Sequence, residues 1–379
     1  MRIAVIHHFY DERNPSGENS LVRMQIEALL RAGHEVRLFE THGHEISDLR
    51  SKIVVSSNLL NGSGENFNDE IFSFNPHLVH VHNTFPLISL TNIAKLNYPK
   101  VMTLHNFRFV CASGTLSRDG NPCDLCVGKS KLSALKYKCY RNSILATIPL
   151  MIMQTGTYLT DFVNSFNRII VVNSEIANVL ARDGFTITNT KVLSNFVAEQ
   201  VADQKSQNRT KFIYCGRITE DKGLPWLLAR WPANVDRLEI FGTGPKEAEL
   251  RAMYRGNVEF FGHIERSLLL AKLPNYKALI LPSLWSEGSP MVALEALSFG
   301  IPVLAHKNSA IGLLIDQEGA GIAFDSKESL LAAINELEKN YESYAAKANI
   351  FFAANFSEKS WIKETESIYQ EAIENFHSG

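Results

Sequence analysis

Short runs of strand-forming residues alternate with helical segments along nearly the whole chain, and this alternation narrows the available folds more than any other feature. Residues 2–6 read as a strand, residues 19–32 show helical periodicity, and residues 35–40 alternate as the next strand. Strand, helix and strand in this order are typical of a βαβ unit, and such units build parallel sheets covered by helices. The sequence therefore predicts an α/β fold.

The alternation is interrupted by a polar stretch without periodicity at residues 198–210, and it restarts at residue 211. A chain of 379 residues is long enough for about two domains. We expect two doubly wound α/β domains, residues 1–197 and 211–356, joined by this linker. In such sheets ligands bind beyond the carboxyl ends of the strands, so the expected site lies between the two domains.

Composition argues against several classes of protein. Hydrophobic residues make up 45% of the chain and charged residues 21%, and the formal net charge of −2 gives no basis for nucleic-acid binding. No apolar run is long enough to span a membrane, and the first residues read as a strand rather than a secretory leader. We therefore expect a cytoplasmic protein, peripheral to the membrane at most, without a disulfide framework.

Residues 283–305 read as loop, helix, turn and strand, with strong signals at both helix ends. Ser289 is a favourable N-cap, and Pro290 suits the first helical position, where a missing N–H costs nothing. Gly300 suits the position just after the helix, and Pro302 prevents its continuation. We expect a helix that begins at Pro290 and ends before Gly300, followed by a buried strand.

The start of this helix is a candidate anion site. The backbone N–H groups of Met291 and Val292 have no helical acceptor there, and the helix dipole is positive at that end. Glu287 precedes the helix and Glu295 lies within it. One interpretation is a loop that holds a phosphorylated, polyhydroxylated ligand, with amides donating to phosphate and carboxylates accepting from hydroxyls. Plain capping, in which the acid only complements the dipole, is the other.

Two cations follow the first strand of the second domain. Arg217 and Lys222 come after Cys215 and Gly216, and the glycine lets the backbone approach a ligand. Two cations can neutralise a diphosphate and stabilise its charge as it leaves, whereas solvated surface cations are the alternative. Gly242 begins another glycine turn after a strand. Neither this turn nor the first βα turn has the Gly-x-Gly-x-x-Gly fingerprint, which disfavours a nicotinamide dehydrogenase.

Polar residues also follow strands of the first domain. His82-Asn83 and His105-Asn106 each end a predicted strand, and Gly17 precedes a predicted helix, where it could meet an anion or a sugar. A single histidine is usually structural. Two His-Asn pairs at two strand ends favour a functional site.

These motifs together resemble the retaining glycosyltransferases of the GT-B class, family 4. The resemblance spans nearly the whole chain, with the motifs in the family's order, and rests on Glu287 and Glu295 with seven residues between them, on Gly216, Arg217 and Lys222, on the Gly242 turn and on His105. It implies two Rossmann-like domains, a nucleotide-sugar donor held mainly by the second, and a C-terminal helix at residues 357–379 that crosses back onto the first. It also implies catalysis without a bound metal and retention by same-face attack, in which the leaving phosphate takes the acceptor's proton.

The resemblance also implies a role for each matching residue. His105, Glu287, Arg217 and Lys222 would be the catalytic groups, with the two cations on the diphosphate and His105 against the donor sugar near the reacting carbon. The remaining donor contacts would come from Gly17, Gly216, Gly242, Ile264 near the base, Gly288, Ser289, Met291, Val292 and Glu295, the last on the ribose hydroxyls.

Residues 108–142 form an insert with four cysteines: Cys111, Cys123, Cys126 and Cys139. A Cys-x-x-Cys pair with two more cysteines nearby has the ligand count of a structural zinc site. Reduced cysteines packed as small apolar groups, or a loose redox pair, are the alternatives. The insert also resembles cysteine-bearing inserts of bacterial polysaccharide-assembly members of the family, and this resemblance implies a shared structural role.

The same insert carries a basic run without acids, formed by Lys129, Lys131, Lys136, Lys138 and Arg141, beside the apolar segment 144–153. Such a surface would bind anionic lipid headgroups. Docking at the inner face of the cytoplasmic membrane would fit a lipid-linked acceptor. A solvated basic face beside a buried helix is the alternative.

The function expected from the resemblance is transfer of a hexose-type sugar from a UDP- or GDP-sugar to a carbohydrate or lipid-linked oligosaccharide acceptor. The setting would be the assembly of capsule, exopolysaccharide or lipopolysaccharide. Two alternatives stay open: a nucleotide-sugar epimerase on the same scaffold, and a non-catalytic subunit that only binds a sugar nucleotide.

Overall fold

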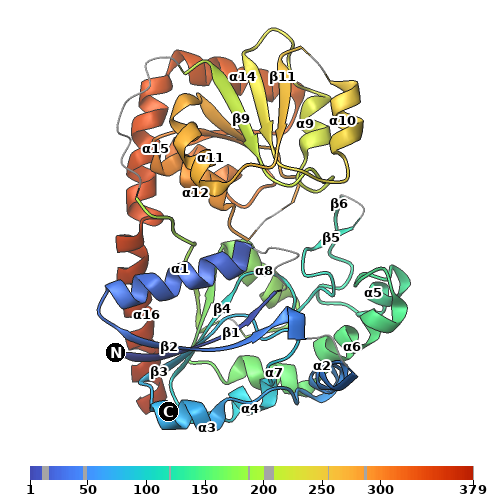
Figure 1. Ribbon diagram of the computed structural model, residues 1–379, viewed down its shortest axis with the longest axis vertical. Helices are drawn as coiled ribbons and strands as arrows, with labels where there is room; N and C mark the ends of the chain where they lie inside the picture. Colours follow the sequence, from blue (N-terminus) through green and yellow to red (C-terminus); the bar gives the residue numbers. More distant parts are fainter. Residues whose placement is uncertain are drawn as a thin grey trace. The chain divides into compact units, whose positions relative to one another are not determined.

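The computed structural model describes residues 1–10, 17–45, 49–118, 121–186, 188–199, 209–254, 256–285 and 288–378. The chain divides into two compact units (Figure 1). Unit 1 comprises Met1–Leu116, Asp124–Ser194 and Ile362–Gly379, and unit 2 comprises Ser117–Cys123 and Asn195–Trp361. Most of the predicted linker, residues 200–208, lies outside the described residues.

Unit 1 is built on a six-stranded parallel sheet with the strand order β2-β1-β3-β4-β7-β8. Its strands are β1 (Arg2–Phe9), β2 (Glu35–His42), β3 (Leu78–Val81), β4 (Lys100–Leu104), β7 (Arg168–Val171) and β8 (Thr190–Val192). Nearly all of β1 and all of β3 and β4 are buried, as expected for central strands covered on both faces. The strand order reverses between β1 and β3, and such a reversal is where α/β sheets bind ligands.

The helices of unit 1 follow the predicted alternation, with local differences. They are α1 (Gly17–Arg31), η1 (Gly43–Glu45), α2 (Leu49–Asn61), α3 (Asn68–Phe74), α4 (Leu90–Ala94), α5 (Leu132–Lys136), α6 (Ile144–Thr155), α7 (Thr157–Asn164) and α8 (Ser174–Arg182). The sequence of residues 143–166 predicts a helical segment, which the structure divides at Gly156, whose backbone is extended between α6 and α7. The sequence of residues 58–68, rich in Asn, Gly and Ser, predicts a loop, but this segment begins inside the last turn of α2.

The last helix, α16 (Glu358–Ser378), begins in unit 2 and ends in unit 1. Tyr369 is fully buried, and its hydroxyl lies 2.7 Å from Nδ1 of His80 on β3. Two carboxylates add to this anchor, because Glu366 lies 3.0 Å from Nε2 of His34 and Glu371 accepts from Arg168 at 2.8 Å. The end of α16 is therefore fixed to unit 1 by buried and half-buried polar contacts.

Unit 2 is built on a second six-stranded parallel sheet, with the order β11-β10-β9-β12-β13-β14. Its strands are β9 (Lys211–Cys215), β10 (Arg237–Phe241), β11 (Val258–Gly262), β12 (Ala278–Leu281), β13 (Val303–His306) and β14 (Gly321–Phe324). The order reverses between β9 and β12. A two-stranded antiparallel ribbon, β5 (Ser117–Arg118) with β6 (Asn121–Pro122), belongs to the insert.

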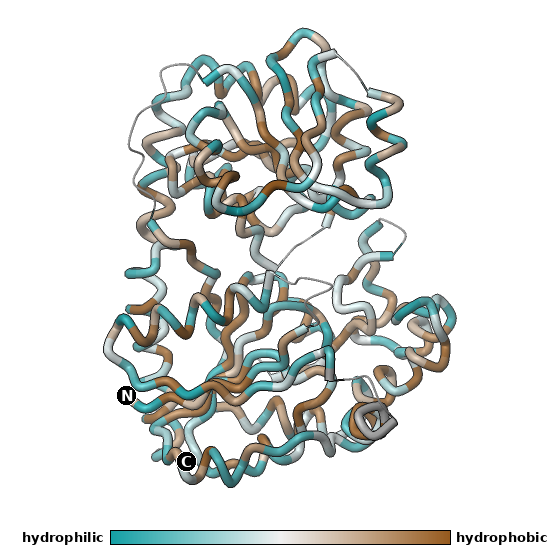
Figure 2. Tube along the Cα trace, viewed as in Figure 1, coloured by the Kyte–Doolittle hydropathy of each residue, from teal (hydrophilic) through white to brown (hydrophobic). Residues whose placement is uncertain are grey.

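Helices cover both faces of this second sheet. They are α9 (Leu224–Leu228), α10 (Glu247–Met253), α11 (Arg266–Lys272), η2 (Leu273–Asn275), α12 (Met291–Ser298), α13 (Gly312–Glu318), α14 (Lys327–Lys339) and α15 (Tyr341–Asn355). One core cluster joins α11, α12, α13 and α15, and another joins α9, α10 and α14. Hydrophobic residues gather along the strands between these two layers, where the tube in Figure 2 is largely brown.

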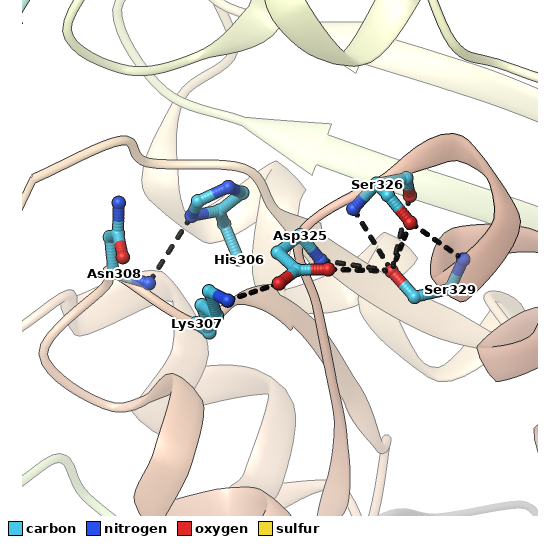
Figure 3. Close-up of polar contacts among 6 residues, drawn as sticks. All are labelled: His306, Lys307, Asn308, Asp325, Ser326 and Ser329. Carbon is cyan, nitrogen blue, oxygen red and sulfur yellow. Dashed lines mark hydrogen bonds and ion pairs between the residues drawn. The ribbon is translucent and has the colours of Figure 1, made fainter.

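At the ends of β13 and β14, polar side chains bond to one another (Figure 3). Lys307 pairs with Asp325, and Ser326 and Ser329 form a capping box at the start of α14. The backbone N–H of Asn308 donates to Nδ1 of His306 at 3.2 Å. These contacts fix the loop after β13 and the start of α14.

Candidate functional site

In unit 2, the strand order reverses between β9 and β12, and the loops that follow these two strands pack against each other. The backbone N–H of Leu284, after β12, donates to the carbonyl of Asp221, after β9, at 3.2 Å. Nζ of Lys222 lies 6.0 Å from the centre of the Trp285 ring. Arg217 is exposed in the same loop, and its carbonyl accepts from the Tyr214 hydroxyl at 2.8 Å. The fold thus brings the predicted cationic loop beside the loop that leads to α12.

The Gly242 turn packs against the chain's own backbone. Gly242 has φ +136°, and a Cβ there would lie 1.9 Å from the carbonyl oxygen of Gly216. The N–H of Gly216 donates to Phe241 at 3.0 Å, and that of Ile218 donates to Thr243 at 2.9 Å. The requirement for glycine at residue 242 therefore comes from the close approach of these two loops. Its predicted contact with a ligand is not tested by this packing.

The helix after the second loop starts one residue later than expected. Pro290 is the N-cap of α12, with φ −75° and ψ 93°, so the prediction that Ser289 caps the helix is wrong. The reason is that Pro290 has an extended backbone while its carbonyl accepts from the N–H of Ala293 at 2.8 Å. Gly300 has φ +66° just after the helix, as the sequence predicts. The N–H groups of Met291 and Val292 belong to the first turn, where α-helices leave donors for a ligand.

Glu295, on the second turn of α12, is buried and paired. Its Oε1 accepts from Nε of Arg266, at the start of α11, at 2.7 Å. Burial raises the pKa of Glu295, and the Arg266 guanidinium opposes this shift. Burial, with a smaller contribution from the Glu295 charge, raises the pKa of the Cys215 thiol to about 12. Ile264 packs, partly buried, against the core cluster that contains α11 and α12.

Two further predicted donor contacts, Gly288 and Ser289, precede α12 in the chain. Glu287, predicted to hold the donor sugar, lies outside the described residues. Arg266 was not singled out from the sequence, because no spacing motif links it to Glu295. Arg266 meets Glu295 because α11 and α12 pack together in one core cluster, which the sequence pattern does not reveal.

In unit 1, a pocket of about 30 Å³ lies beyond β3 and β4. Its lining includes His105, Asn106, Arg108 and Glu18, the last on α1. Nδ2 of Asn106 donates to Oε2 of Glu18 at 3.3 Å, and burial raises the pKa of Glu18 to about 7. Gly17 is the first residue of α1. The space beside its Cα is open, because a Cβ built there would meet no atom within 4 Å. His105 and Glu18 therefore meet at one small pocket of unit 1.

His105 belongs to a cluster of buried histidines. Nε2 of His105 lies 3.1 Å from Nδ1 of His82, and their rings stack with centroids 5.3 Å apart. The His80 ring lies 4.1 Å from that of His82, and the His7 ring lies 6.2 Å from it. Burial lowers the pKa of His105 to about 4 and that of His80 to about 3, so both rings are neutral at pH 7. The sequence indicated His82 and His105 but gave no reason to add His7 from β1.

The four cysteines of the insert, predicted to hold zinc, are all partly buried. In the part of the chain that the structure describes, no group of three or more His, Cys, Asp or Glu side chains is placed to hold one metal ion. Cys126 and Cys139 pack against a small core cluster with Leu150 and Met153 of α6. This packing matches the alternative of cysteines as small apolar groups. The zinc site stays a prediction, for metal analysis of the purified protein to test.

Lys131 does not belong to the predicted basic surface. It is 6% exposed, and its Nζ donates to Oδ1 of Asp183 at 2.6 Å and to the carbonyl of Cys126 at 2.8 Å. The N–H of Gly128 donates to the same Asp183 oxygen at 2.8 Å. Lys131 therefore ties the insert to the end of α8. The other four cations of the run, Lys129, Lys136, Lys138 and Arg141, are exposed.

No helix among the described residues has the length and apolar character needed to cross a membrane.

Two family models match the chain. The model described as Glycosyltransferase Family 4 matches residues 15–201, and the model described as Glycosyl transferases group 1 matches residues 209–340. The chain is 32% identical over 154 residues to an exopolysaccharide phosphotransferase of Streptomyces coelicolor, covering 36% of this chain and 15% of that protein. It is 27% identical over 139 residues to a GDP-mannose-dependent alpha-(1-6)-phosphatidylinositol dimannoside mannosyltransferase of Mycobacterium tuberculosis, covering 35% and 36%. The matches thus span less than half of either relative.

Solved structures share the fold over almost the whole chain. A sucrose-phosphate synthase from Thermosynechococcus elongatus has a TM-score of 0.67 at 17% identity, over 98% of both chains. HepE of Anabaena, solved in complex with UDP, has a TM-score of 0.60 at 15% identity, over 97% of this chain and all of that one. These neighbours and the two parallel sheets confirm the predicted fold class, the two-domain GT-B architecture. The chain belongs to the family 4, group 1 glycosyltransferases.

Proposed function

We propose that this glycosyltransferase takes its sugar from a UDP- or GDP-sugar and transfers it, with retention of configuration, to a carbohydrate or lipid-linked acceptor. The observation that carries the proposal is the packing of the Arg217–Lys222 loop against the loop that leads to α12. Two cations and the positive end of a helix lie beside the strand-order reversal of one sheet. This is the set of charges that a diphosphate needs.

Each group has one role in this proposal. Arg217 and Lys222 hold the diphosphate, and the N–H groups of Met291 and Val292 donate to its oxygens. Glu295 accepts from the ribose hydroxyls. When the acceptor oxygen bonds to the anomeric carbon, the bond from that carbon to the diphosphate oxygen breaks. The leaving phosphate then takes the acceptor's proton on the same face of the sugar, so the cations stabilise charge that grows in the transition state.

The relatives support a donor of this class. HepE of Anabaena was solved with UDP, and the M. tuberculosis relative is GDP-mannose-dependent by name. The S. coelicolor relative is named for exopolysaccharide, which supports a setting in surface polysaccharide assembly. Because the chain spans only part of the curated relatives, donor, acceptor and pathway all belong to the proposal.

Nuclear magnetic resonance of the protein incubated with UDP-glucose or GDP-mannose, without acceptor, tests the reaction class. We expect slow hydrolysis that releases the α-anomer first, because water then replaces the acceptor on the same face. Arg237→Ala is the matched control. Arg237 lies at the amino end of β10, whereas Arg217 and Lys222 follow the carboxyl end of β9, and it pairs with Glu259 at 2.7 Å. The control should hydrolyse the donor at the wild-type rate.

The same spectra separate the alternatives. Accumulation of an epimeric sugar nucleotide would establish the epimerase and overturn the transferase. First release of the β-anomer would contradict retention. Binding of the nucleotide sugar without hydrolysis, followed by no new glycoside when carbohydrate acceptors are added to the same sample, would indicate the non-catalytic subunit.

We also propose that residues 129–145 of unit 1, which comprise the end of the insert and the start of α6, dock on an anionic membrane. Apolar side chains of α5 and α6 are exposed, with Leu132 63%, Ile144 48% and Leu145 82% accessible. Four exposed cations lie in the same segment, and anionic headgroups attract each basic residue by about 1 kcal/mol near the surface. This pairing of apolar and basic residues fits a lipid-linked acceptor.

Sedimentation with phosphatidylglycerol vesicles tests this surface. Leu145→Asp should reduce the bound fraction several-fold, because it places a charge of the wrong sign at the apolar contact. Leu313→Asp is the control, since Leu313 is 57% exposed on α13 of unit 2. Equal binding of the wild type and both variants, or no binding to vesicles at all, would contradict membrane docking.

A further inference from the structure

An ion pair joins two helices that begin at the same edge of the unit 2 sheet. Arg266 is the first residue of α11, after β11, and Glu295 lies on the second turn of α12, after β12. Nε of Arg266 donates to Oε1 of Glu295 at 2.7 Å. Leu269 of α11 and Leu294 of α12 share one core cluster, which keeps the two helices together. The pair therefore rests on a packed framework.

The two partners differ sharply in exposure. The Glu295 side chain is 6% exposed, whereas that of Arg266 is 50% exposed. Among the described residues, two charged or titratable groups interact electrostatically with this carboxyl: the Arg266 guanidinium and the Cys215 thiol. Burial favours the protonated acid, and the arginine favours the carboxylate. Arg266 is thus the group that opposes protonation of the buried carboxyl and fixes the direction of one of its oxygens.

We propose that Arg266 is a positioning residue, which bonds to one oxygen of Glu295 so that the carboxylate presents its other oxygen to the ribose hydroxyls of the donor. Arg266 acts through Glu295 and does not bind the hydroxyls itself. This inference rests on the proposed function, which makes Glu295 the ribose ligand. It adds the residue that holds that ligand in place.

Calorimetric titration with UDP and with 2′,3′-dideoxyuridine diphosphate tests this role, with the guanosine pair used if GDP binds more tightly. Arg266→Ala should weaken UDP binding about tenfold, the scale of one charged hydrogen bond, and dideoxy-UDP binding less than about twofold. Arg266→Lys should recover part of the loss. Arg251→Ala is the control, because Arg251 pairs with Glu247 on its own helix, α10, at 2.9 Å, and both affinities should stay unchanged.

Two further readouts distinguish positioning from a general loss of structure. Without Arg266 the pKa of Glu295 should rise further, so UDP binding should weaken at a higher pH than in the wild type as the pH falls. In a Glu295→Gln background, Arg266→Ala should have no added effect on UDP affinity. A thermal unfolding scan shows whether each variant is folded.

The outcomes separate the inference from the proposed function. If the wild type binds dideoxy-UDP as tightly as UDP, Glu295 is not a ribose ligand and the donor-site assignment fails. If the wild type discriminates and Arg266→Ala keeps the full discrimination, the positioning role is wrong while the donor site stands. A loss that persists in the Glu295→Gln background would also contradict action through Glu295.

Discussion

Replacing Arg217 with alanine is expected to slow turnover of the nucleotide sugar by about 100-fold, because its charge stabilises the diphosphate as it leaves. Arg217 is exposed at the start of the loop after β9, so its removal leaves no cavity in the core. Lys222→Ala should mainly weaken donor binding, since Nζ of Lys222 lies 6.0 Å from the centre of the Trp285 ring, in the loop that leads to α12. Initial rates over a range of donor concentrations separate these two effects.

The control for both variants is Arg237→Ala, at the amino end of β10 in the same sheet, which should keep wild-type kinetics. Thermal unfolding of each variant should stay close to that of the wild type, because surface substitutions of this kind change stability little. Near-normal donor kinetics in both Arg217→Ala and Lys222→Ala would remove the diphosphate site from this loop.

Replacing Gly242 with alanine is expected to destabilise unit 2 by about 3 kcal/mol, the largest stability effect that we predict. Its φ of +136° is strained for any residue with a Cβ, and that Cβ would lie 1.9 Å from the carbonyl oxygen of Gly216. The two loops would have to separate, which breaks the hydrogen bonds between residues 216–218 and 241–243. The urea midpoint of unfolding measures the loss.

Gly256→Ala separates backbone strain from steric overlap. Gly256 also has a positive φ, +87°, but a Cβ there would meet no atom within 4 Å. It should lose only about 1 kcal/mol, the cost of a left-handed conformation. Equal losses in the two variants would show that the contact between the Gly216 and Gly242 loops is not tight.

The fold could be predicted from the sequence because strand–helix alternation is a local pattern with one common solution. Helix α1 lies close to its predicted range, residues 19–32. The start of α12 was missed by one residue, since Ser289 and Pro290 are both good initiators and only the backbone of Pro290 decides between them. Gly156 divided a predicted helix for a similar reason, because its extended conformation is not fixed by periodicity.

Candidate site residues could be predicted from the sequence only where they come shortly after the end of a predicted strand. Arg217, Lys222 and the α12 start are each short distances along the chain from a strand end. Arg266 and the histidine cluster depend instead on which strands are neighbours in the sheet. The buried contact between His80 and Tyr369 joins residues 289 positions apart, so it has no local signal. Lys131 read as a surface cation because its partner, Asp183, lies on another element.

A thermal-shift screen of the wild-type protein with UDP, GDP and ADP tests the central claim most directly. A ligand that binds only the folded state stabilises it by RT ln(1 + [L]/Kd), so the unfolding temperature keeps rising with ligand concentration. We predict a clear upward shift with UDP or GDP that grows with concentration and is strongly reduced in Lys222→Ala. No shift with any of the three nucleotides, at millimolar concentration, would contradict a nucleotide-sugar site in unit 2.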